Sequence, residues 1–288
     1  MKRRDSGTQL TTAYEHIALY GSEAEPVKIF GTGNLLNTFY STMEQEAPIV
    51  WELNRLFLDL WNPEATSNDW VLPDNFHVHV KVMRKVEEQV HFLNTPYTVI
   101  KEINAPKKVG RSIGANTTHS LDALVVREMA RRCMYDPQTV SDTKSILVHH
   151  GKDTAEELTG ILLQTASKQT HMVLTLWNHY KNSGYLSARI INYINVVNVR
   201  YVDKAVLLEL IESLPIKPFE VLSVHDCFRC LPAYGNDLRK QYNLQLSLIA
   251  KSNLLSFIIS QLVGAPVNSP VKDESMAEEI LQANYSLS

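Results

Sequence analysis

The stretch FEVLSVHDCFRCLP, residues 219–232, decides how this chain is interpreted. The β-branched and aromatic residues of FEVLSV predict a strand that ends at His225 and Asp226, and the letters CFRCL predict a second short strand directly after it. Together they predict a β-hairpin with an acidic residue at its tip. The same stretch holds Cys227 and Cys230 in a C-x-x-C pair, so zinc or redox chemistry is an alternative.

The cysteine pattern favours packing over chemistry. A structural zinc ion needs four ligands, usually from two such pairs or from one pair and two histidines at fixed spacing, and Cys133 is the only further cysteine. A redox pair should open a helix, whereas Leu231 and Pro232 end this segment. We therefore expect reduced thiols, with Cys227 and Cys230 packed beside a strand turn.

The composition is that of an ordinary globular chain. Of its 288 residues 44% are hydrophobic and 20% are charged, and the formal net charge is -3. This length allows two subdomains. No apolar run reaches the length of a membrane span, and the basic start MKRRDSGTQL has no apolar stretch behind it. We expect a cytoplasmic protein that does not contact membranes.

Charge is unevenly distributed along the chain. Ten basic residues oppose five acidic ones between residues 77 and 135, and four acidic residues lie among the last 16 positions. The basic side chains are Lys81, Arg84, Lys85, Lys101, Lys107, Lys108, Arg111, Arg127, Arg131 and Arg132. This surplus is compatible with one basic wall of a nucleic-acid channel, and a solvated face with chance clustering is the alternative.

Hydrophobic periodicity divides the N-terminal half. Residues 27–62 predict helical pieces that are broken at Gly31 and Gly33 and end before Pro63. Apolar residues alternate with polar ones over 76–82, which predicts a strand, and the segment QVHFLNTPYTVIKEI is its expected antiparallel partner. We thus expect one hairpin over 76–103.

Helical patterns dominate the second half. A helix is expected directly after GANTTHSLD, and residues 134–200 predict a helical insertion. Within it, Thr154 and Glu157 form a capping-box pattern that predicts one long helix up to the letters NSG. The segment DKAVLLELIESLP predicts a short buried helix that leads into the opening stretch.

A single carboxylate at a hairpin tip cannot by itself hold the two metal ions of nucleotidyl transfer. Two-metal phosphoryl or nucleotidyl transfer holds its ions about 4 Å apart, so carboxylates from at least two strands must converge on them. We expect Asp122 to follow a loop into a helix and Asp74 to lie in a turn, so neither sits at a comparable strand end. Either another chain supplies the second carboxylate, or Asp226 is structural.

The opening stretch and four other segments resemble the single-subunit RNA polymerases of bacteriophages and mitochondria. SVHDCF resembles their motif C, whose aspartate binds the catalytic metal ions. The further matches occur in the family's order: LYGS at the end of motif B, WVLPDNF in the fingers, GANTTHSLDA where the fingers return to the palm, and the C-terminal ILQANYSLS. Together they extend from Leu19 to Ser288, except for residues 134–200.

The resemblance implies an α+β fold of the right-hand polymerase type. A mostly helical fingers part would occupy 1–118 and include the end of the motif B helix and the 76–103 hairpin. Residues 119–133 would form the fingers-to-palm helix, and 134–200 the insertion. Residues 201–288 would form part of a palm, with motif C on an antiparallel hairpin and the C-terminal tail.

The departures from the family pattern imply a second chain. Motif A, an aspartate followed by glycine, does not occur in the sequence. Where the family has an arginine and a lysine in motif B, this chain has Thr8 and Thr12. The resemblance is therefore to the C-terminal subunit of a split, two-chain phage RNA polymerase, active as a heterodimer with a partner that carries motif A. It would work in the cytoplasm of an infected bacterial host.

Two residues carry the chemistry that the resemblance implies. Asp226 would be the catalytic ligand of the Mg²⁺ ions that activate the RNA 3′ hydroxyl and bind the incoming triphosphate. His225 would lie beside it, near the RNA end. The expected partners are thus the second polymerase subunit, the DNA template, the nascent RNA and the NTPs.

Four further residues would bind substrate. Tyr20 would lie under the nascent base pair, where Gly21 allows close backbone approach. His119 would contact the 2′ hydroxyl that distinguishes RNA from DNA. The Ser288 carboxylate would pack by the nucleotide site. For each of them an ordinary structural role is the alternative.

Two other functions compete with this reading. An HD-type metal-dependent phosphohydrolase also uses a His-Asp pair together with distant His and Asp residues, which His119 and Asp122 would supply. That fold is all-helical, so strands around residues 219–231 argue against it. The second alternative is a structural subunit without catalytic activity.

Overall fold

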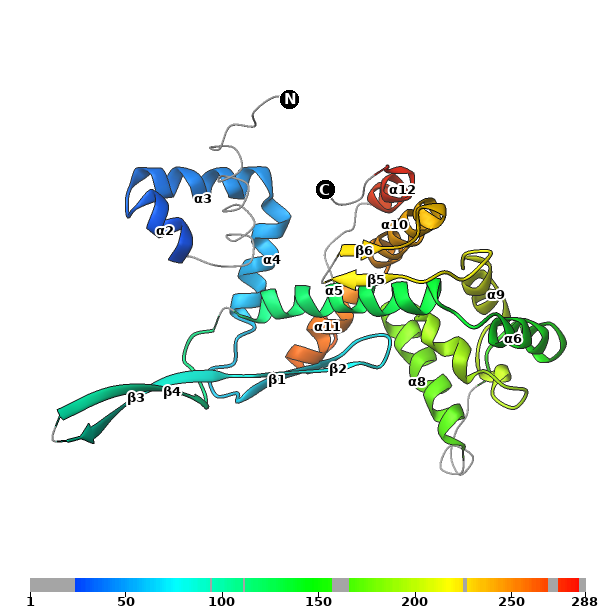
Figure 1. The fold of residues 1–288 in the computed structure, drawn as a ribbon, viewed down its shortest axis with the longest axis horizontal. Coiled ribbons are helices and arrows are strands. Elements are labelled where there is room, and N and C mark those ends of the chain that lie inside the picture. The colour runs from blue at the N-terminus through cyan, green and yellow to red at the C-terminus, as the bar shows by residue number, and fades with distance from the viewer. Residues whose placement is uncertain are drawn as a thin grey trace. The chain divides into compact units, whose positions relative to one another are not determined.

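The structure, a computed structural model, describes residues 24–93, 95–110, 112–156, 166–224, 227–268 and 274–284. Helices and small antiparallel sheets alternate along these residues, which confirms an α+β fold (Figure 1). The chain divides into two compact units. Unit 1 takes the residues up to 69 and residues 79–120, and unit 2 takes 70–78 and 121–288.

The described residues of unit 1 begin with the helices α2 (Ala24–Phe30), α3 (Asn34–Glu46) and α4 (Pro48–Asp59). The break predicted at two glycines is confirmed. Gly31 has a φ of 68°, in the left-handed region that glycine adopts without steric cost, and Gly33 precedes the first turn of α3. Aromatic rings connect the helices, because Phe30 stacks on Phe39 with centroids 4.9 Å apart.

Strands β1 (Ser67–Val71) and β2 (His77–Lys81) pair with each other, and the longer β3 (Met83–Phe92) pairs antiparallel with β4 (Thr95–Asn104). The expected pairing of 76–82 with 89–103 is therefore wrong. Five residues join β1 to β2, which is enough for a turn between paired strands. A single residue, Val82, separates β2 from β3, and one residue is too short to reverse the chain, so these two strands do not form a hairpin.

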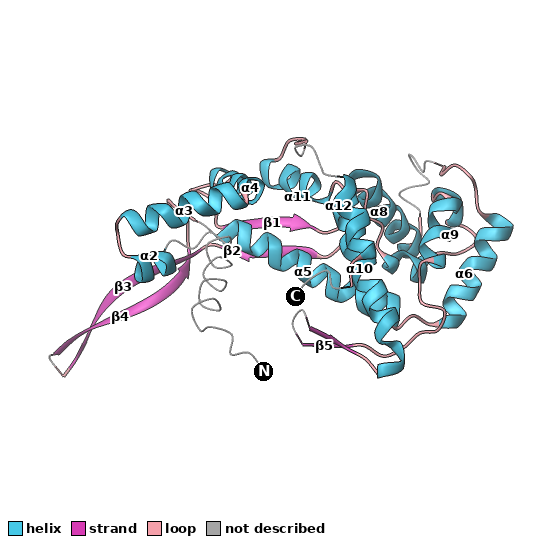
Figure 2. Cartoon of the chain, turned by 90° about the horizontal axis from the view of Figure 1, so that it is seen from above, coloured by secondary structure: helices cyan, strands magenta, loops and turns pink. Residues whose placement is uncertain are grey.

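The β3–β4 ribbon is long and twisted, with almost every residue exposed (Figure 2). Its register pairs Val90 with Tyr97 and Phe92 with Thr95. Because side chains alternate between the two faces of a strand, most of the apolar residues of this register gather on one face, and Met83 and Ile100 lie on the other. Those on the first face are Val86, Val90, Phe92, Tyr97, Val99 and Ile103.

Helix α5 (Ser112–Cys133) is longer than the sequence pattern predicts. The segment GANTTHSLD forms its first half, so the expectation that a loop precedes Asp122 is wrong. Hydroxyl groups of this polar segment bond back to carbonyl groups of the preceding helical turn. Thr118 Oγ1 donates to the Gly114 carbonyl at 3.1 Å, and Ser120 Oγ donates to the Thr117 carbonyl at 2.7 Å.

The main core of unit 2 lies between α6 (Pro137–His150), α8 (Lys168–Ser183) and α9 (Lys204–Glu212). Two 3₁₀ turns, η1 (Ala188–Tyr193) and η2 (Val199–Tyr201), complete it. Its buried residues come both from the expected insertion and from the residues after it. They include Leu147, Val173, Leu176, Ile190, Val199, Leu207 and Leu210.

The single long helix expected from Thr154 is wrong at its start. Glu156 is not helical, and its backbone N–H donates to the Arg200 carbonyl at 2.8 Å. Helix α8 begins only at Lys168, where the Ser167 hydroxyl accepts the N–H of Thr170. Its end is confirmed, with Gly184 at a φ of 70° as the C-cap.

The C-terminal part of unit 2 contains β5 (Leu222–Val224), β6 (Cys227–Arg229) and the turn η3 (Pro232–Tyr234). Helices α10 (Gly235–Lys251), α11 (Leu254–Val263) and α12 (Glu274–Gln282) follow, and α10 and α12 lie side by side (Figures 1 and 2). In the described part of the chain, no single helix has the length and apolar character of a membrane span. Only the bent pair of η3–α10 with α11 passes that test together.

We predict that Leu176→Ala lowers the free energy of unfolding by about 2–5 kcal/mol, because it leaves a cavity in the main core of unit 2. Leu176 is 1% exposed. Chemical denaturation checks the change. The control is Leu35→Ala on α3, where the side chain is 69% exposed and a near-neutral effect is expected. Equal effects of the two substitutions would contradict the assigned core.

Candidate functional site

Strands β5 and β6 form the hairpin that the opening stretch predicts. They pair antiparallel, with Val224 opposite Cys227. Each strand has three residues and is shorter than expected, since 219–221 and Cys230 are not in strands. His225 and Asp226, between the paired residues, lie outside the described residues.

The base of the hairpin is anchored to α5 and α10. The backbone N–H of Phe219 donates to the Cys133 carbonyl at the end of α5, at 2.7 Å. The Phe219 ring stacks on Tyr234 with centroids 4.8 Å apart, and Phe228 contacts Tyr242 at 5.5 Å. These rings belong to a small core that also buries Val125, Met129 and Val221. The base of the hairpin is therefore held by packing, through Phe219 and Val221 on one side and Phe228 on the other.

The three thiols are free, as expected, but they differ in exposure. Burial raises the pKa of Cys133 to about 12, so this thiol is unreactive. Cys230 packs against the small core, which agrees with the packing interpretation. Cys227 is exposed, so for this residue the interpretation is wrong. Side chains alternate along a strand, and Phe228 takes the inward position.

The outer side of the hairpin carries uncovered apolar side chains. Leu222 is 70% exposed and Val224 is 58% exposed. All three residues of β5 are exposed. A two-stranded hairpin is marginally stable in water unless a further strand or helix covers it. This side is therefore suited to contact with another chain.

The predicted substrate residues are mostly outside the described part of the chain. Tyr20, Gly21 and Ser288 lie there, as do His225 and Asp226. His119 is described and lies on α5, in the part that belongs to unit 1, whereas the hairpin belongs to unit 2. That the predicted site residues lie together therefore stays a prediction.

The root of the C-terminal tail is fixed on α10. Arg239 Nη1 and Asn243 Nδ2 both donate to the Ala283 carbonyl, at 3.0 and 2.8 Å. The Ser247 hydroxyl donates to the Ala277 carbonyl at 2.8 Å. These bonds satisfy polar groups of α10 that face α12.

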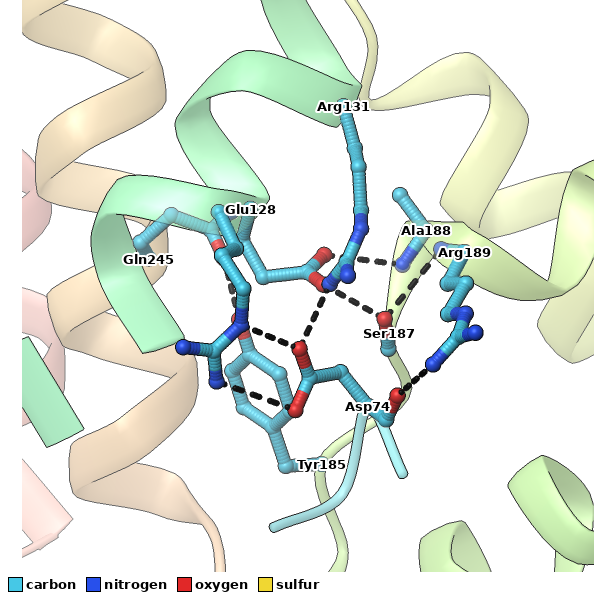
Figure 3. Close-up of polar contacts among 9 residues, drawn as sticks. Asp74, Glu128, Arg131, Tyr185, Ser187, Ala188, Arg189 and Gln245 are labelled. Carbon is cyan, nitrogen blue, oxygen red and sulfur yellow. Dashed lines mark hydrogen bonds and ion pairs between the residues drawn. The ribbon is translucent and has the colours of Figure 1, made fainter. Parts of the chain in front are cut away.

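A buried ion-pair cluster lies in the same unit (Figure 3). Asp74, 0% exposed, accepts Arg127 Nε at 2.6 Å and Arg131 Nη1 at 2.8 Å through Oδ2, and its Oδ1 accepts Arg127 Nη2 at 3.2 Å. Its backbone carbonyl accepts Arg189 Nη1 at 2.8 Å. One residue of the β1–β2 turn thus contacts both α5 and η1.

Glu128 supplies the second buried carboxylate of the cluster. It is 0% exposed and accepts Arg131 Nη1 at 2.6 Å, the Ser187 hydroxyl, and the backbone N–H of Ala188 at 2.9 Å (Figure 3). Arg131 therefore bridges both acids. We call Asp74, Arg127, Glu128, Arg131, Ser187 and Arg189 the Asp74 cluster.

Hydrogen bonding decides the ionisation of Asp74. Burial alone would raise the pKa of this carboxyl group, but hydrogen bonds and charge attraction from Arg127 and Arg131 outweigh burial and lower it. The carboxylate is thus ionised at neutral pH and pairs with two guanidinium groups.

Arg132, 1% exposed, is the third arginine of α5 and points into the protein. Its Nε donates to Gln241 Oε1 at 2.8 Å, and its Nη2 donates to the Ser213 carbonyl at 3.1 Å. Three of the ten cations counted between 77 and 135 therefore bind acceptors within unit 2. This reduces the expected basic wall, because Arg127 and Arg131 are paired with buried acids and Arg132 is itself buried.

The Asp74 cluster was not predicted from the sequence. Asp74 was correctly placed in a turn, and Arg127 and Arg131 were counted as surface charge. The available signal was the spacing of Arg127, Glu128 and Arg131 on one helix. Nothing in the sequence connects this helix with a turn more than 50 residues earlier.

No group of three or more His, Cys, Asp or Glu side chains that could hold a metal ion occurs among the described residues. A magnesium ion at this hairpin would rest on Asp226, which is not described. In comparisons with known proteins, the sequence matched no family profile and no curated protein.

We predict that Asp74→Asn lowers the free energy of unfolding by about 3–5 kcal/mol at pH 7, because it removes the charge that two partly buried arginines bind. Because the pKa of Asp74 is lowered in the folded state, its ionised carboxylate stabilises the fold at pH values above the ordinary pKa of about 3.9. That stabilisation is lost as the pH falls through the folded-state pKa. The difference between wild type and variant should therefore shrink below about pH 4.

Urea unfolding at several pH values measures both effects. The matched control is Asp153→Asn, because Asp153 is exposed and its replacement should be near neutral. A constant difference between pH 7 and pH 2.5 would contradict the assigned role of the Asp74 carboxylate.

Proposed function

We propose that this chain is a subunit of a DNA-directed RNA polymerase of the single-subunit phage type, and that a partner chain completes its active site. In this proposal Asp226 is a catalytic carboxylate for template-dependent ribonucleotide transfer. The single observation that carries it is the order of five motif-like segments along the chain, with SVHDCF in the position of motif C.

The strands flanking His225 and Asp226 support the polymerase over its enzymatic alternative. An HD-type phosphohydrolase carries its His-Asp pair on a helix. Here β5 ends at Val224 and β6 begins at Cys227, so strands adjoin the pair on both sides. A short hairpin on a packed base is a suitable support for one catalytic acid, because it restricts where that acid can move.

The WVLPDNF segment gives additional support. The family has a glycine where this chain has Asn75. Asn75 adopts a φ of 57°, in the left-handed region that glycine enters freely and that asparagine tolerates better than most residues. The backbone demand at this position thus accounts for the exchange.

Mg²⁺ is the cofactor that the proposal requires, and it would lower the barrier by stabilising charge on the attacking and leaving oxygens. Asp226 would provide one carboxylate, and the partner would provide motif A. His225 and the substrate residues Tyr20, Gly21, His119 and Ser288 would position the RNA end and the nucleotide. The described residues contribute by fixing the hairpin, through Phe219 and Phe228.

We predict that the complex of this chain with its partner makes RNA from a DNA template, and that Asp226→Asn reduces the rate by at least about a hundredfold, because an amide binds Mg²⁺ weakly. Radiolabelled nucleotide incorporation measures the rate, and the control is Asp153→Asn. Unchanged synthesis by Asp226→Asn would contradict the catalytic role. RNA synthesis by the purified chain alone would contradict the need for a partner.

The exposed side of β5 gives a prediction about assembly. Leu222→Asp combined with Val224→Asp should weaken binding of the partner chain about tenfold or more, because buried charge opposes association at an apolar contact. Co-purification and titration calorimetry measure the effect. Ile216→Asp is the control, since Ile216 is 97% exposed elsewhere in unit 2. Equal affinities of the wild type and the double variant for the partner would mean that the partner binds elsewhere.

A further inference from the structure

The β1–β2 turn holds an aromatic ring at the protein surface. Phe76 is 46% exposed, and the guanidinium carbon of Arg127 lies 4.1 Å from its ring centroid. This is a cation–π contact, in which the positive group lies over the face of the ring. The other face of the ring is not used by this contact.

The position of the guanidinium group is fixed from the side. Arg127 Nε and Nη2 bind the two carboxylate oxygens of Asp74, which is fully buried. A bidentate pair with a buried acid fixes the plane of the guanidinium group. Its edge is therefore held by Asp74 and its face by the Phe76 ring.

The turn itself is also fixed. The N–H of Leu72 donates to the Phe76 carbonyl at 2.9 Å, and the N–H of Asn75 donates to the Leu72 carbonyl at 2.8 Å. Leu72 is 0% exposed. A half-exposed ring on a turn held in this way needs little further ordering when a ligand stacks on it.

The two neighbouring arginines retain hydrogen-bond donors. Arg127 and Arg131 are each 22% exposed. With the described residues, Arg131 uses only Nη1, and Arg127 leaves Nη1 without an acceptor. Arginine donors held in a fixed plane are suited to phosphate oxygens.

We propose that Phe76 is a stacking platform for one base of a single-stranded nucleic acid, with the spare donors of Arg127 and Arg131 directed at an adjacent phosphate. A base would stack on the ring face that Arg127 leaves open. The choice of nucleic acid as the ligand rests on the proposed function, whereas the platform rests on the contacts above. Template DNA and product RNA share this chemistry.

The test measures binding to the purified chain, without partner or catalysis. Fluorescence anisotropy would use labelled eight-residue oligothymidine, oligouridine and an abasic oligomer of the same length. Phe76→Leu should weaken binding of the base-carrying oligomers about tenfold, since base–aromatic stacking contributes about 1–3 kcal/mol. Phe76→Trp should retain or strengthen it. Tighter binding of oligothymidine would identify the ligand as template DNA, and tighter binding of oligouridine would identify it as product RNA.

Matched controls separate stacking from general charge attraction. The abasic oligomer should bind wild type and Phe76→Leu equally, and Ile216→Ala should change nothing. Thermal unfolding of each variant confirms folding. Equal affinity of wild type and Phe76→Leu, or of base-carrying and abasic oligomers for wild type, would overturn the platform. A lack of oligomer binding at low salt would also overturn the platform. Failure of the two-chain complex to synthesise RNA would contradict the proposed function alone.

Discussion

The pairing of two buried carboxylates with the arginines of α5 is the interaction on which unit 2 depends. Asp74 and Glu128 are fully buried, and Arg131 bridges them. A buried charge that loses its partner costs several kcal/mol, so the members of the Asp74 cluster hold one another in place. Through it, a turn near residue 74, the helix α5 and the η1 segment form one assembly, although they are far apart in sequence.

The same helix carries the candidate catalytic hairpin on another face. At 100° per residue, Arg127 and Arg131 lie roughly opposite Val125, Met129 and Cys133 on α5. The second group forms the small core under β5 and β6, and the Cys133 carbonyl receives the N–H of Phe219. Helix α5 thus contacts the Asp74 cluster on one face and the base of the hairpin on the other.

Two surfaces of unit 2 expose apolar or aromatic side chains to water. The hairpin exposes Leu222 and Val224. The Phe76 ring, half exposed over a fixed guanidinium group, is the second such surface. A second chain and a nucleic-acid strand would each cover apolar or aromatic groups that are otherwise in contact with water.

Local pattern in the sequence determined the α+β class, the helix breaks at Gly31 and Gly33, the end of α8 at Gly184 and the strands beside His225 and Asp226. These features depend on backbone preferences and on neighbours within a few residues. Tertiary structure alone decided that Cys227 faces outward and that Arg127, Arg131 and Arg132 are bound internally. The reason is physical: a charge takes whichever partner folding brings near, and that partner lies up to about 110 residues away along the chain.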